Sequence, residues 1–588
     1  MTEPRSESSS PRFGVAIVRA LITAGVCDFV LAPGSRSAPL ALALAAAERM
    51  GLARLHVRVD ERSAGYLALG IAKGGVADPA ARKFRPVAVV TTSGTAAVNL
   101  HPAIVEASFG GVPLIALTAD RPPRLRRVGA HQTIDQPHIF GDVVRFECDL
   151  HVGDESAQPI EAALAVQMAT DAGNPGPVHI NIAFDEPLVD PTFDCAAMLG
   201  EISDRTLAAG DHRQSVIVGS YPNAKEVWKS AAQHSRGIII VGDTAGLPES
   251  AADPQRIAYL ADATGWPIIV EPSASMAPRP EVLAHGALLL GDAGFMAQHF
   301  PDVVVTVGRV GLHRGVLRLM AQVSTHLSVD PRPVGLRCNP LGTAKPGVES
   351  LPEDEIRGCP EGAWTRAWVK ADHDLARVIG ASLESAQPLS GPVVARVVVQ
   401  SLTESDLFVV GPSWPMRHVS EWAPRTQARC IANRGTSGID GVVSTAWGAA
   451  LAHDAYTVAL IGDLTSVYDR NGLLSAPGEL LPHLTYVVAD NDGGGIFSSL
   501  EQADDAFCAD FERVFGTPRG RELSTLLAGS GAEVVSVNTT AQLHDALENA
   551  RRSCSVSIII ASCVSRDEEA RIVQRLRSVA ASELAPGG

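Results

Sequence analysis

The sequence predicts an α/β protein with three consecutive domains, each formed by a parallel β-sheet flanked by helices. Short β-branched runs alternate with Ala- and Leu-rich helical stretches along all 588 residues, which is the pattern of parallel sheets covered by helices. Two stretches rich in Pro, Gly and acidic residues, 188–211 and 339–362, lack an apolar period and indicate linkers. We therefore expect domains over residues 1–190, 200–375 and 390–588.

The strand candidates fall into three groups along the chain. Each is a short apolar run, as expected for strands that are buried on both faces. In the first domain they are 28–32, 87–92, 114–118 and 178–183. In the second domain they are 238–242, 267–271 and 303–308. In the third domain they are 407–411, 458–462, 486–489, 534–537 and 556–561.

Composition and charge narrow the class of protein. Hydrophobic residues make up 46% and charged residues 19% of the chain, as in folded globular proteins. The 49 Lys and Arg against 65 Asp and Glu give a net charge of −16, which disfavours nucleic acids and anionic membranes as partners. The nine cysteines form no C-x-x-C pair and the N-terminus is polar, so we expect reduced thiols in a cytoplasmic protein. No apolar run predicts an integral membrane segment.

Oxygen-bearing residues follow two apolar strands in the last third of the chain. Gly462 and Asp463 end one strand, and Asn491 and Gly493 follow the next one. In open α/β sheets, ligands bind at the carboxyl ends of the strands. A carboxylate, an amide oxygen and a backbone carbonyl form a hard oxygen set suited to Mg²⁺, which keeps waters and bridges substrate phosphates. Two ordinary strand-to-loop turns are the alternative interpretation, because Asp, Asn and Gly are common in turns.

Several further strings accompany this pattern. They are APGSRSAPL from Ala32, TSGTA from Thr92, LTADRPP from Leu117, QTI from Gln132, NRGTSGIDG from Asn433 and GGGIF from Gly493. The spacing of G-D-x and N-x-G resembles the diphosphate-binding signature of thiamine-diphosphate (ThDP) enzymes, although Leu464 replaces the usual third glycine and Asp490 a common Asn. The strings together resemble the 2-succinyl-5-enolpyruvyl-6-hydroxy-3-cyclohexene-1-carboxylate synthase family. The resemblance covers about residues 12–565 and is thin in the middle domain.

The resemblance implies a fold of the ThDP-dependent decarboxylase type and assigns a metal site. The first domain would bind the pyrimidine of the cofactor, and the last would bind its diphosphate and metal. Asp463, Asn491 and the carbonyl of Gly493 would hold Mg²⁺, or Mn²⁺ in its place, against the diphosphate. Gly462 would lie beside them and contact the cofactor.

Glu61 and three apolar residues are implied to act on the organic part of the cofactor. Glu61 would hydrogen-bond a ring nitrogen of the aminopyrimidine and favour the tautomer that deprotonates the thiazolium. Taken alone, Glu61 also fits an acidic residue that opens a helix over 64–73 and complements its dipole. Ile439 would support the bent cofactor, and Ile496 and Phe497 would form an apolar wall. Ordinary core packing is compatible with these apolar roles.

The implied reaction is that of a transferase in menaquinone biosynthesis. It decarboxylates 2-oxoglutarate on ThDP, adds the succinyl carbanion equivalent to isochorismate and releases CO₂. Both substrates carry two carboxylates, which a guanidinium fork matches bidentately. The resemblance assigns contacts with substrate or intermediate to Ser35, Arg36, Arg121, Gln132, Ser413, Arg417 and Arg434, with Arg314 as a further basic position.

Local sequence context adds an anion site and leaves alternatives open. Arg36 precedes a helix whose predicted N-cap is Ser37, where free backbone N–H groups favour anions. A surface ion pair is the alternative role for any single arginine. His131 stands where the family pattern has Asn, so a charge that responds to pH near neutrality lies directly before Gln132.

The arrangement of the predicted residues implies an oligomer. Glu61 and Asp463 lie in different domains, and in the resembling family they meet across a subunit interface, so a homodimer or homotetramer is implied. A different ThDP enzyme, such as an acetolactate synthase or a simple 2-oxo acid decarboxylase, is the nearest alternative. A non-catalytic ligand-binding protein that keeps the fold is the alternative from another class.

Overall fold

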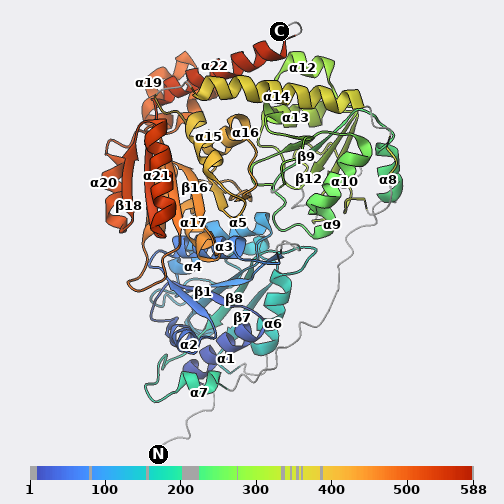
Figure 1. The fold of residues 1–588 in the computed structure, drawn as a ribbon. Coiled ribbons are helices and arrows are strands. Elements are labelled where there is room, and N and C mark those ends of the chain that lie inside the picture. Colours follow the sequence, from blue (N-terminus) through green and yellow to red (C-terminus); the bar gives the residue numbers. More distant parts are fainter. Residues whose placement is uncertain are drawn as a thin grey trace, which may run out of the picture. The chain divides into compact units, whose positions relative to one another are not determined.

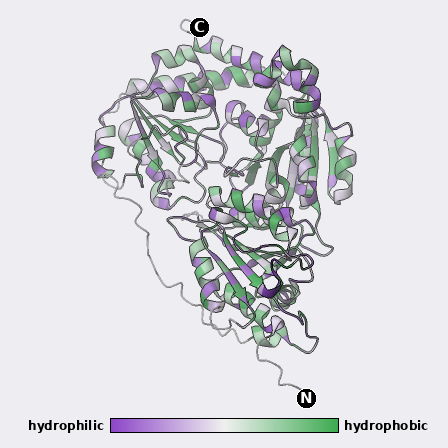
Figure 2. Cartoon of the chain, turned by 180° about the vertical axis from the view of Figure 1, so that it is seen from behind, coloured by the Kyte–Doolittle hydropathy of each residue, from purple (hydrophilic) through white to green (hydrophobic). Residues whose placement is uncertain are grey.

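Three parallel β-sheets flanked by helices form the fold, as Figure 1 shows for this computed structural model. The structure describes residues 9–78, 83–153, 158–200, 224–274, 276–332, 338–344, 347–352, 356–358, 362–384 and 388–585. The central strands of each sheet are hydrophobic, whereas many helices combine hydrophobic and hydrophilic residues (Figure 2). The predicted three-sheet α/β class is therefore confirmed, whereas parts of both predicted linkers lie outside the described residues.

The chain divides into two compact units. The first unit comprises residues 1–216, 435–453 and 469–480. The second unit comprises residues 217–434, 454–468 and 481–588. The first sheet lies in the first unit, and the other two sheets lie in the second. A short segment of the last domain, including Ile439, therefore folds with the N-terminal sheet.

The first sheet has six parallel strands in the order β2-β1-β5-β6-β8-β7. Their bounds are β1 Asp28–Leu31, β2 Arg54–Val57, β5 Val87–Thr91, β6 Leu114–Asp120, β7 Glu147–His151 and β8 Val178–Ala183. A separate antiparallel pair is formed by β3 Val76–Asp78 and β4 Lys83–Phe84. The apolar core on one face is completed by α1 Ser10–Thr23, α2 Ala38–Arg49 and α6 Gln158–Ala169.

Two helices of the first unit approach each other at glycines. They are α3 Glu61–Gly74 and α17 Val442–Leu451. A Cβ atom on Gly70 of α3 would lie 2.1 Å from the carbonyl oxygen of Thr445, and one on Gly448 would lie 2.1 Å from that of Leu67. Because any side chain there would overlap the backbone, these glycines allow the close packing that brings the segment after Arg434 onto the N-terminal sheet.

The middle sheet has the order β11-β10-β9-β12-β13. Its strands are β9 Gly237–Val241, β10 Ile268–Val270, β11 Val282–Leu283, β12 Val303–Val307 and β13 Thr325–Val329. The order reverses between β9 and β12, which is where such sheets bind ligands. There the backbones of Asp243 and Arg309 pair through two hydrogen bonds of 2.9 and 2.8 Å, so the two loops contact each other directly.

The third sheet repeats the order of the first. Its strands are β14 Leu407–Val410, β15 Arg429–Ile431, β16 Thr457–Gly462, β17 Leu484–Asp490, β18 Glu533–Val537 and β19 Val556–Ser562, arranged β15-β14-β16-β17-β19-β18. Counted along the chain, both sheets read 2-1-3-4-6-5. Each therefore reverses between its first and third strands, at β1/β5 and at β14/β16, and these two points are the expected ligand crevices.

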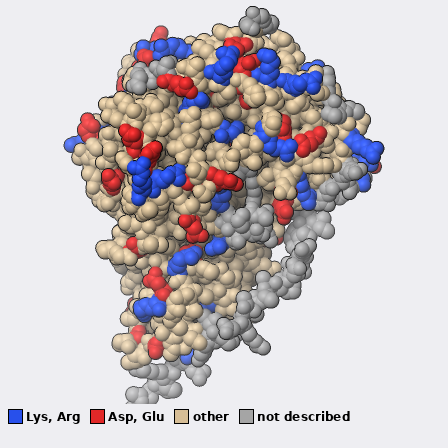
Figure 3. Space-filling view, viewed as in Figure 1, with Lys and Arg blue, Asp and Glu red and all other residues tan. Residues whose placement is uncertain are grey.

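Two long helices of the second unit pack side by side. The helix α14 Gly362–Glu384 runs beside α22 Arg566–Leu584 (Figure 1), and Arg377 pairs with Glu583 at 2.6 Å between them. On the face seen in Figure 3, acidic and basic side chains are interspersed. Across the described residues, no helix combines the length and the apolar character that crossing a bilayer requires.

Candidate active site

Glu61 is the first residue of α3 and lies near the N-terminal sheet. The preceding Asp60 caps the helix, because its Oδ1 accepts hydrogen bonds from the backbone N–H groups of Arg62 at 2.9 Å and Ser63 at 3.2 Å. Asn99, at the end of α4 Thr95–Asn99, donates its Nδ2 hydrogen to Glu61 Oε2 at 3.4 Å. The cap fixes where the helix begins, and Asn99 engages one of the two carboxylate oxygens of Glu61.

Ile439 belongs to a segment that is anchored to the same unit. Glu106 is buried and accepts hydrogen bonds from the backbone N–H groups of Gly435 at 2.8 Å and Thr436 at 2.6 Å. Tyr66 on α3 donates to Asp440 at 2.6 Å. These contacts hold both ends of the loop that carries Ile439. The structure thus places Ile439 and Glu61 in one unit, although they are far apart in the sequence.

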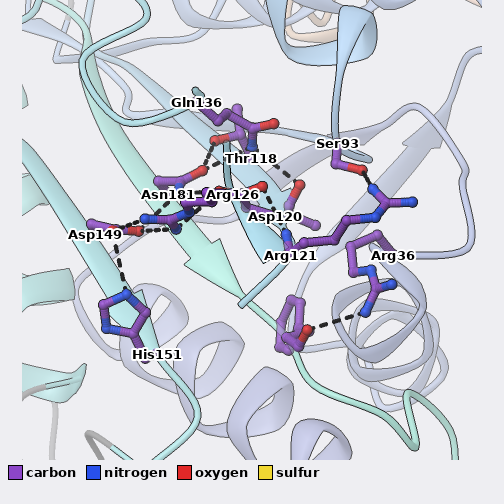
Figure 4. A network of polar contacts seen from close by, with 12 residues as sticks. Arg36, Ser93, Thr118, Asp120, Arg121, Arg126, Gln136, Asp149, His151 and Asn181 are labelled. Atoms are coloured by element: carbon purple, nitrogen blue, oxygen red, sulfur yellow. Dashed lines mark hydrogen bonds and ion pairs between the residues drawn. The ribbon is translucent and has the colours of Figure 1, made fainter. Parts of the chain in front are cut away.

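Two predicted arginines lie close to each other near the carboxyl ends of the strands of the first sheet (Figure 4). Arg36 donates to the carbonyl oxygen of Phe184 at 3.1 Å. Arg121 donates to Ser93 Oγ and, at 2.6 Å, to the carbonyl oxygen of Gln132. Burial lowers the pKa of Arg121, and the positive charge of Arg36 lowers it further. The fold therefore brings together two guanidinium groups that repel each other and that an anion would stabilise.

The Gln132 loop is held by a second glutamine that sequence reasoning missed. Gln132 has a φ of 51° and donates through Nε2 to the carbonyl oxygen of Ser93 at 3.1 Å. The buried Gln136 accepts from the N–H of Gly94 at 3.1 Å and donates to Asn181 Oδ1 at 2.8 Å. Gln136 belongs to the polar network drawn in Figure 4, and it lies outside the motifs quoted from the sequence, which end at Ile134 in this region.

The predictions at Ser35, Ser37 and His131 have different outcomes. Ser35 is exposed beside Arg36, and its predicted contact with a ligand stays a prediction. Ser37 is the N-cap residue of α2, but its side chain makes no capping hydrogen bond and donates instead to the carbonyl oxygen of Gly34 at 3.0 Å. The predicted side-chain cap is therefore wrong, because Ser37 has a φ of −85° and a ψ of 3° rather than extended backbone. His131 is exposed.

The crevice of the third sheet begins with a strained serine. Ser413 follows β14 with a φ of 70° and is the N-cap residue of α16 Trp414–Trp422. This left-handed backbone is costly for a residue with a Cβ atom, and such strain concentrates at functional sites. Arg417, one turn into α16, donates through Nη1 to the carbonyl oxygen of Ser413 at 3.3 Å.

A cavity of about 710 Å³ adjoins Arg417 in the second unit. Its lining includes Arg314, Arg318, Trp414, Arg417, Ile496 and Arg577. Burial lowers the pKa of Arg417, and the positive charges of Arg434, Arg314 and Arg577 lower it further, whereas Glu421 opposes them. The cavity therefore concentrates positive charge beside the apolar side chains of Trp414 and Ile496.

Two predicted site residues have partners away from this cavity. Arg434 donates to the buried Glu271 at 3.1 Å, and Glu271 also accepts from the N–H of Leu312 at 2.7 Å. The ring of Phe497 packs against that of Phe515, with 5.6 Å between their centroids. Ile496 and Phe497 were predicted to form one apolar wall beside the cofactor. In the structure Ile496 lines the cavity, whereas Phe497 packs against Phe515.

The predicted metal ligands follow two adjacent strands. Asp463 comes directly after β16 and Asn491 directly after β17, and Gly462 pairs with Ala489 between these strands. Asp463 Oδ1 accepts from the N–H of Leu464 at 2.8 Å. Gly493 has a φ of 133°, a conformation that favours glycine. The two strand ends thus bring the carboxylate, the amide and the Gly493 backbone to one edge of the sheet.

The charge at this edge fits a cation. Asp463 Oδ2 is buried, and among the described residues no hydrogen bond satisfies it. Burial raises the pKa of Asp463 to about 7, with Arg519 opposing the rise and Asp490 adding to it. The guanidinium of Arg519 stands at 3.1 Å from Asp463 Oδ2 and 2.8 Å from Asp490 Oδ1. Asp463 Oδ2 therefore accepts no hydrogen bond from the described part of the chain but lies beside a guanidinium, and the carboxylates of Asp463 and Asp490 supply negative charge that could also bind Mg²⁺.

The metal prediction rests on mixed oxygen donors. Within the described ranges, no group of three or more His, Cys, Asp or Glu side chains is arranged to hold a metal ion. The predicted set instead uses one carboxylate, one amide oxygen and one backbone carbonyl, a mixed oxygen set that suits Mg²⁺. Glu61 lies in the first unit, and the metal ligands lie in the second.

Comparison with known proteins identifies relatives along nearly the whole chain. Residues 11–139 match the family model of the thiamine pyrophosphate enzyme, N-terminal TPP binding domain. A 2-succinyl-5-enolpyruvyl-6-hydroxy-3-cyclohexene-1-carboxylate synthase of Thermobifida fusca is 41% identical over 90% of this chain and 92% of its own length. The synthase of the same name from Saccharopolyspora erythraea is 40% identical over 90% of this chain and 92% of its own length. The synthase of the same name from a Nocardioides species is 36% identical over 98% of this chain and 99% of its own length.

Proposed function

Because the chain belongs to the 2-succinyl-5-enolpyruvyl-6-hydroxy-3-cyclohexene-1-carboxylate synthase family, we propose that it uses the residues described above for the reaction of that family. It is a ThDP-dependent transferase of menaquinone biosynthesis. Its substrates are 2-oxoglutarate, which loses CO₂, and isochorismate, which accepts the remaining four-carbon unit. The observation that carries this proposal is the 41% identity to a named synthase over 90% of the chain.

The cofactor residues are proposed from the chemistry of their side chains. When bound, ThDP supplies a thiazolium that accepts the electron pair released as CO₂ leaves. Glu61 would hydrogen-bond the aminopyrimidine with the carboxylate oxygen that Asn99 does not engage. Asp463, Asn491 and the Gly493 carbonyl would hold Mg²⁺, with Mn²⁺ as a substitute. This assignment is supported by Oδ2 of Asp463, which is buried and accepts no hydrogen bond from the described residues.

The substrate residues are proposed from the clustering of arginines. Burial and the positive charge of Arg36 lower the pKa of Arg121 in the first unit, and burial and neighbouring arginines lower the pKa of Arg417 in the second. A dicarboxylate would relieve this repulsion and accept paired hydrogen bonds from each guanidinium. Arg314 lines the cavity together with Arg417. Ser35, Gln132, Ser413 and Arg434 are proposed to complete the contacts with substrate or intermediate.

The assembly and location follow from the family and from the thiols. We expect a homodimer or homotetramer in which Glu61 of one subunit serves the metal site of another. The eight cysteines in the described part of the chain are free, which suits the reducing cytoplasm. Light scattering of the purified protein would determine the oligomeric state.

The test is a reaction with defined substrates. Purified protein is incubated with ThDP, Mg²⁺ and 2-oxoglutarate, with and without isochorismate, while CO₂ release and product mass are measured. We expect an adduct four carbons larger than isochorismate, formed only when isochorismate is present. Release of CO₂ without the adduct would indicate another acceptor. Turnover of pyruvate in preference to 2-oxoglutarate would indicate a different ThDP enzyme.

A further inference from the structure

A buried glutamate near the C-terminus contacts the predicted metal ligand Asn491. Glu569 lies on α22 and is 1% exposed. Its Oε2 accepts a hydrogen bond from Asn491 Nδ2 at 2.7 Å. Its Oε1 accepts from the N–H of Gly391 at 2.8 Å and faces His418 Nε2 at 3.2 Å. The carboxylate therefore has partners on both of its oxygens.

The chemistry of this contact determines which way the Asn491 amide points. Glu569 Oε2 accepts the hydrogen bond that Asn491 Nδ2 donates, so the NH₂ group of Asn491 faces Glu569. The amide oxygen consequently points to the opposite side of the planar amide, away from Glu569. We infer that Glu569 is a positioning residue that keeps the oxygen of Asn491 available to Mg²⁺. This inference rests on the proposed function, in which Asn491 is a metal ligand.

The surroundings of Glu569 keep it in place. Gly391 is the first residue of α15 Gly391–Ser401, and a Cβ atom there would lie 2.1 Å from Glu569 Oε1 and 2.5 Å from the ring of His418. Only glycine permits this approach. His418 lies on α16, the helix that begins after Ser413. Glu569 thus joins α15, α16 and α22 to the loop that follows β17.

The Asn491 amide has little room to turn by itself. A Cβ atom on Gly495 would lie 2.7 Å from Asn491 Nδ2, so the backbone of the following loop closes on the amide. In metal sites, hydrogen bonds from a second layer of residues orient the ligands, and their loss weakens metal binding by about 10- to 100-fold. We expect Glu569 to contribute to metal affinity in this range.

The substitution Glu569→Gln tests the inference with almost no change in volume. The new side chain must present its oxygen to the N–H of Gly391, so its NH₂ group faces Asn491. The Asn491 amide then turns its oxygen toward that donor and away from the metal. We expect the Mg²⁺ concentration for half-saturation, measured by calorimetry with saturating ThDP, to rise about 10-fold or more. Circular dichroism should show an unchanged fold.

Exchanging the hydrogen-bond donor and acceptor between positions 491 and 569 should restore the Mg²⁺ affinity that Glu569→Gln loses. In the double variant Glu569→Gln/Asn491→Asp, the introduced amide donates to one oxygen of the introduced carboxylate and leaves the other oxygen for the metal. We expect this pair to recover most of the Mg²⁺ affinity. In an Asn491→Ala background, Glu569→Gln should cause no further loss, since residues that act through one another are not additive.

A matched control separates positioning from general destabilisation. Asp406 is a buried carboxylate before β14, at the opposite edge of the same sheet, and Arg551 pairs with it at 2.7 Å. We expect Asp406→Asn to lower the unfolding temperature without changing the half-saturating Mg²⁺ concentration. The inference is overturned if Glu569→Gln changes only the unfolding temperature, or if its effect persists in the Asn491→Ala background. Failure of the unmodified protein to bind ThDP with Mg²⁺ would instead overturn the proposed function, and the inference with it.

Discussion

The guanidinium of Arg519 lies 3.1 Å from Oδ2 of Asp463, at the buried carboxylate oxygen that is the predicted anchor of the metal. The same side chain contacts Asp490 at 2.8 Å and Asp492 at 3.3 Å. Its positive charge therefore compensates three carboxylates at the carboxyl ends of β16 and β17. In this structure, a cationic side chain stands beside the oxygen that Mg²⁺ would bind.

Replacement of Arg519 by an uncharged residue should lower the stability of the metal-free protein and strengthen its binding of Mg²⁺. In Arg519→Met the three carboxylates lose their compensating charge, so we expect a lower unfolding temperature without metal. The more negative site should attract a cation more strongly, so Mg²⁺ with ThDP should raise the unfolding temperature more than in the unmodified protein. Thermal unfolding with and without Mg²⁺ and ThDP measures both effects. Weaker Mg²⁺ binding in the variant would show that Arg519 supports the metal site.

Loss of the Glu61 carboxylate should abolish most of the chemistry and preserve the fold. We expect Glu61→Gln to slow CO₂ release about 10²- to 10⁴-fold, because proton transfer by a positioned group contributes a factor of this size. The helix should still form, since Asp60 supplies the cap. Single-turnover decarboxylation measures the rate, and circular dichroism checks the fold. Turnover near that of the unmodified protein would contradict the role of Glu61.

Substitution of Arg417, which lines the cavity, should lower kcat/KM for the substrates without changing the binding of ThDP and Mg²⁺. We expect Arg417→Ala to lower kcat/KM for the dicarboxylic substrates about 100-fold, as when a buried charge loses its partner. Binding of ThDP and Mg²⁺ should remain unchanged by calorimetry. Arg552→Ala is the matched control, because Arg552 is an exposed arginine paired with Glu548 on one helix. Equal losses in both variants would argue against a substrate site at Arg417.

A buried histidine should make the middle domain sensitive to acid. His326 lies between the hydroxyl groups of Thr306 at 3.0 Å and Thr343 at 2.8 Å. Burial lowers its pKa from 6.5 to about 4, so the unfolded chain takes up the proton first. The stabilising effect is complete above pH 6.5 and is lost as the pH falls toward 4. By pH 5 the loss is roughly 2 kcal/mol.

The substitution His326→Gln tests this linkage. It should flatten the dependence of unfolding free energy on pH between 6.5 and 4, because no group at position 326 then takes up a proton on unfolding. Denaturant unfolding at pH 7.5 and pH 5 measures the difference. An equally steep loss of stability in the variant would assign the acid sensitivity to other groups.

The central strands could be predicted from the sequence, whereas several edge strands could not. Buried strands such as β5 and β16 are unbroken apolar runs, because helices cover both faces of the sheet. The edge strands β2 and β7 contain Arg, His, Glu and Asp and are partly exposed, so no apolar run marks them. The first and third sheets share one strand order, which could not be predicted from local sequence patterns. Strand order depends on pairing between segments that are distant in the chain.

The family could be recognised from the sequence alone, together with the motif residues predicted to form the site, among them Glu61, Asp463 and Asn491. These residues follow strands or open helices in short recognisable strings, so their chemistry can be read locally. Only the tertiary structure revealed the contacts of Glu569 and Arg519, because Glu569 lies 78 residues after Asn491 in the chain and no local pattern joins them. Folding brings such groups together and buries them. Hydrogen bonds and ion pairs are stronger in the buried, low-dielectric interior, and burial depends on the tertiary structure.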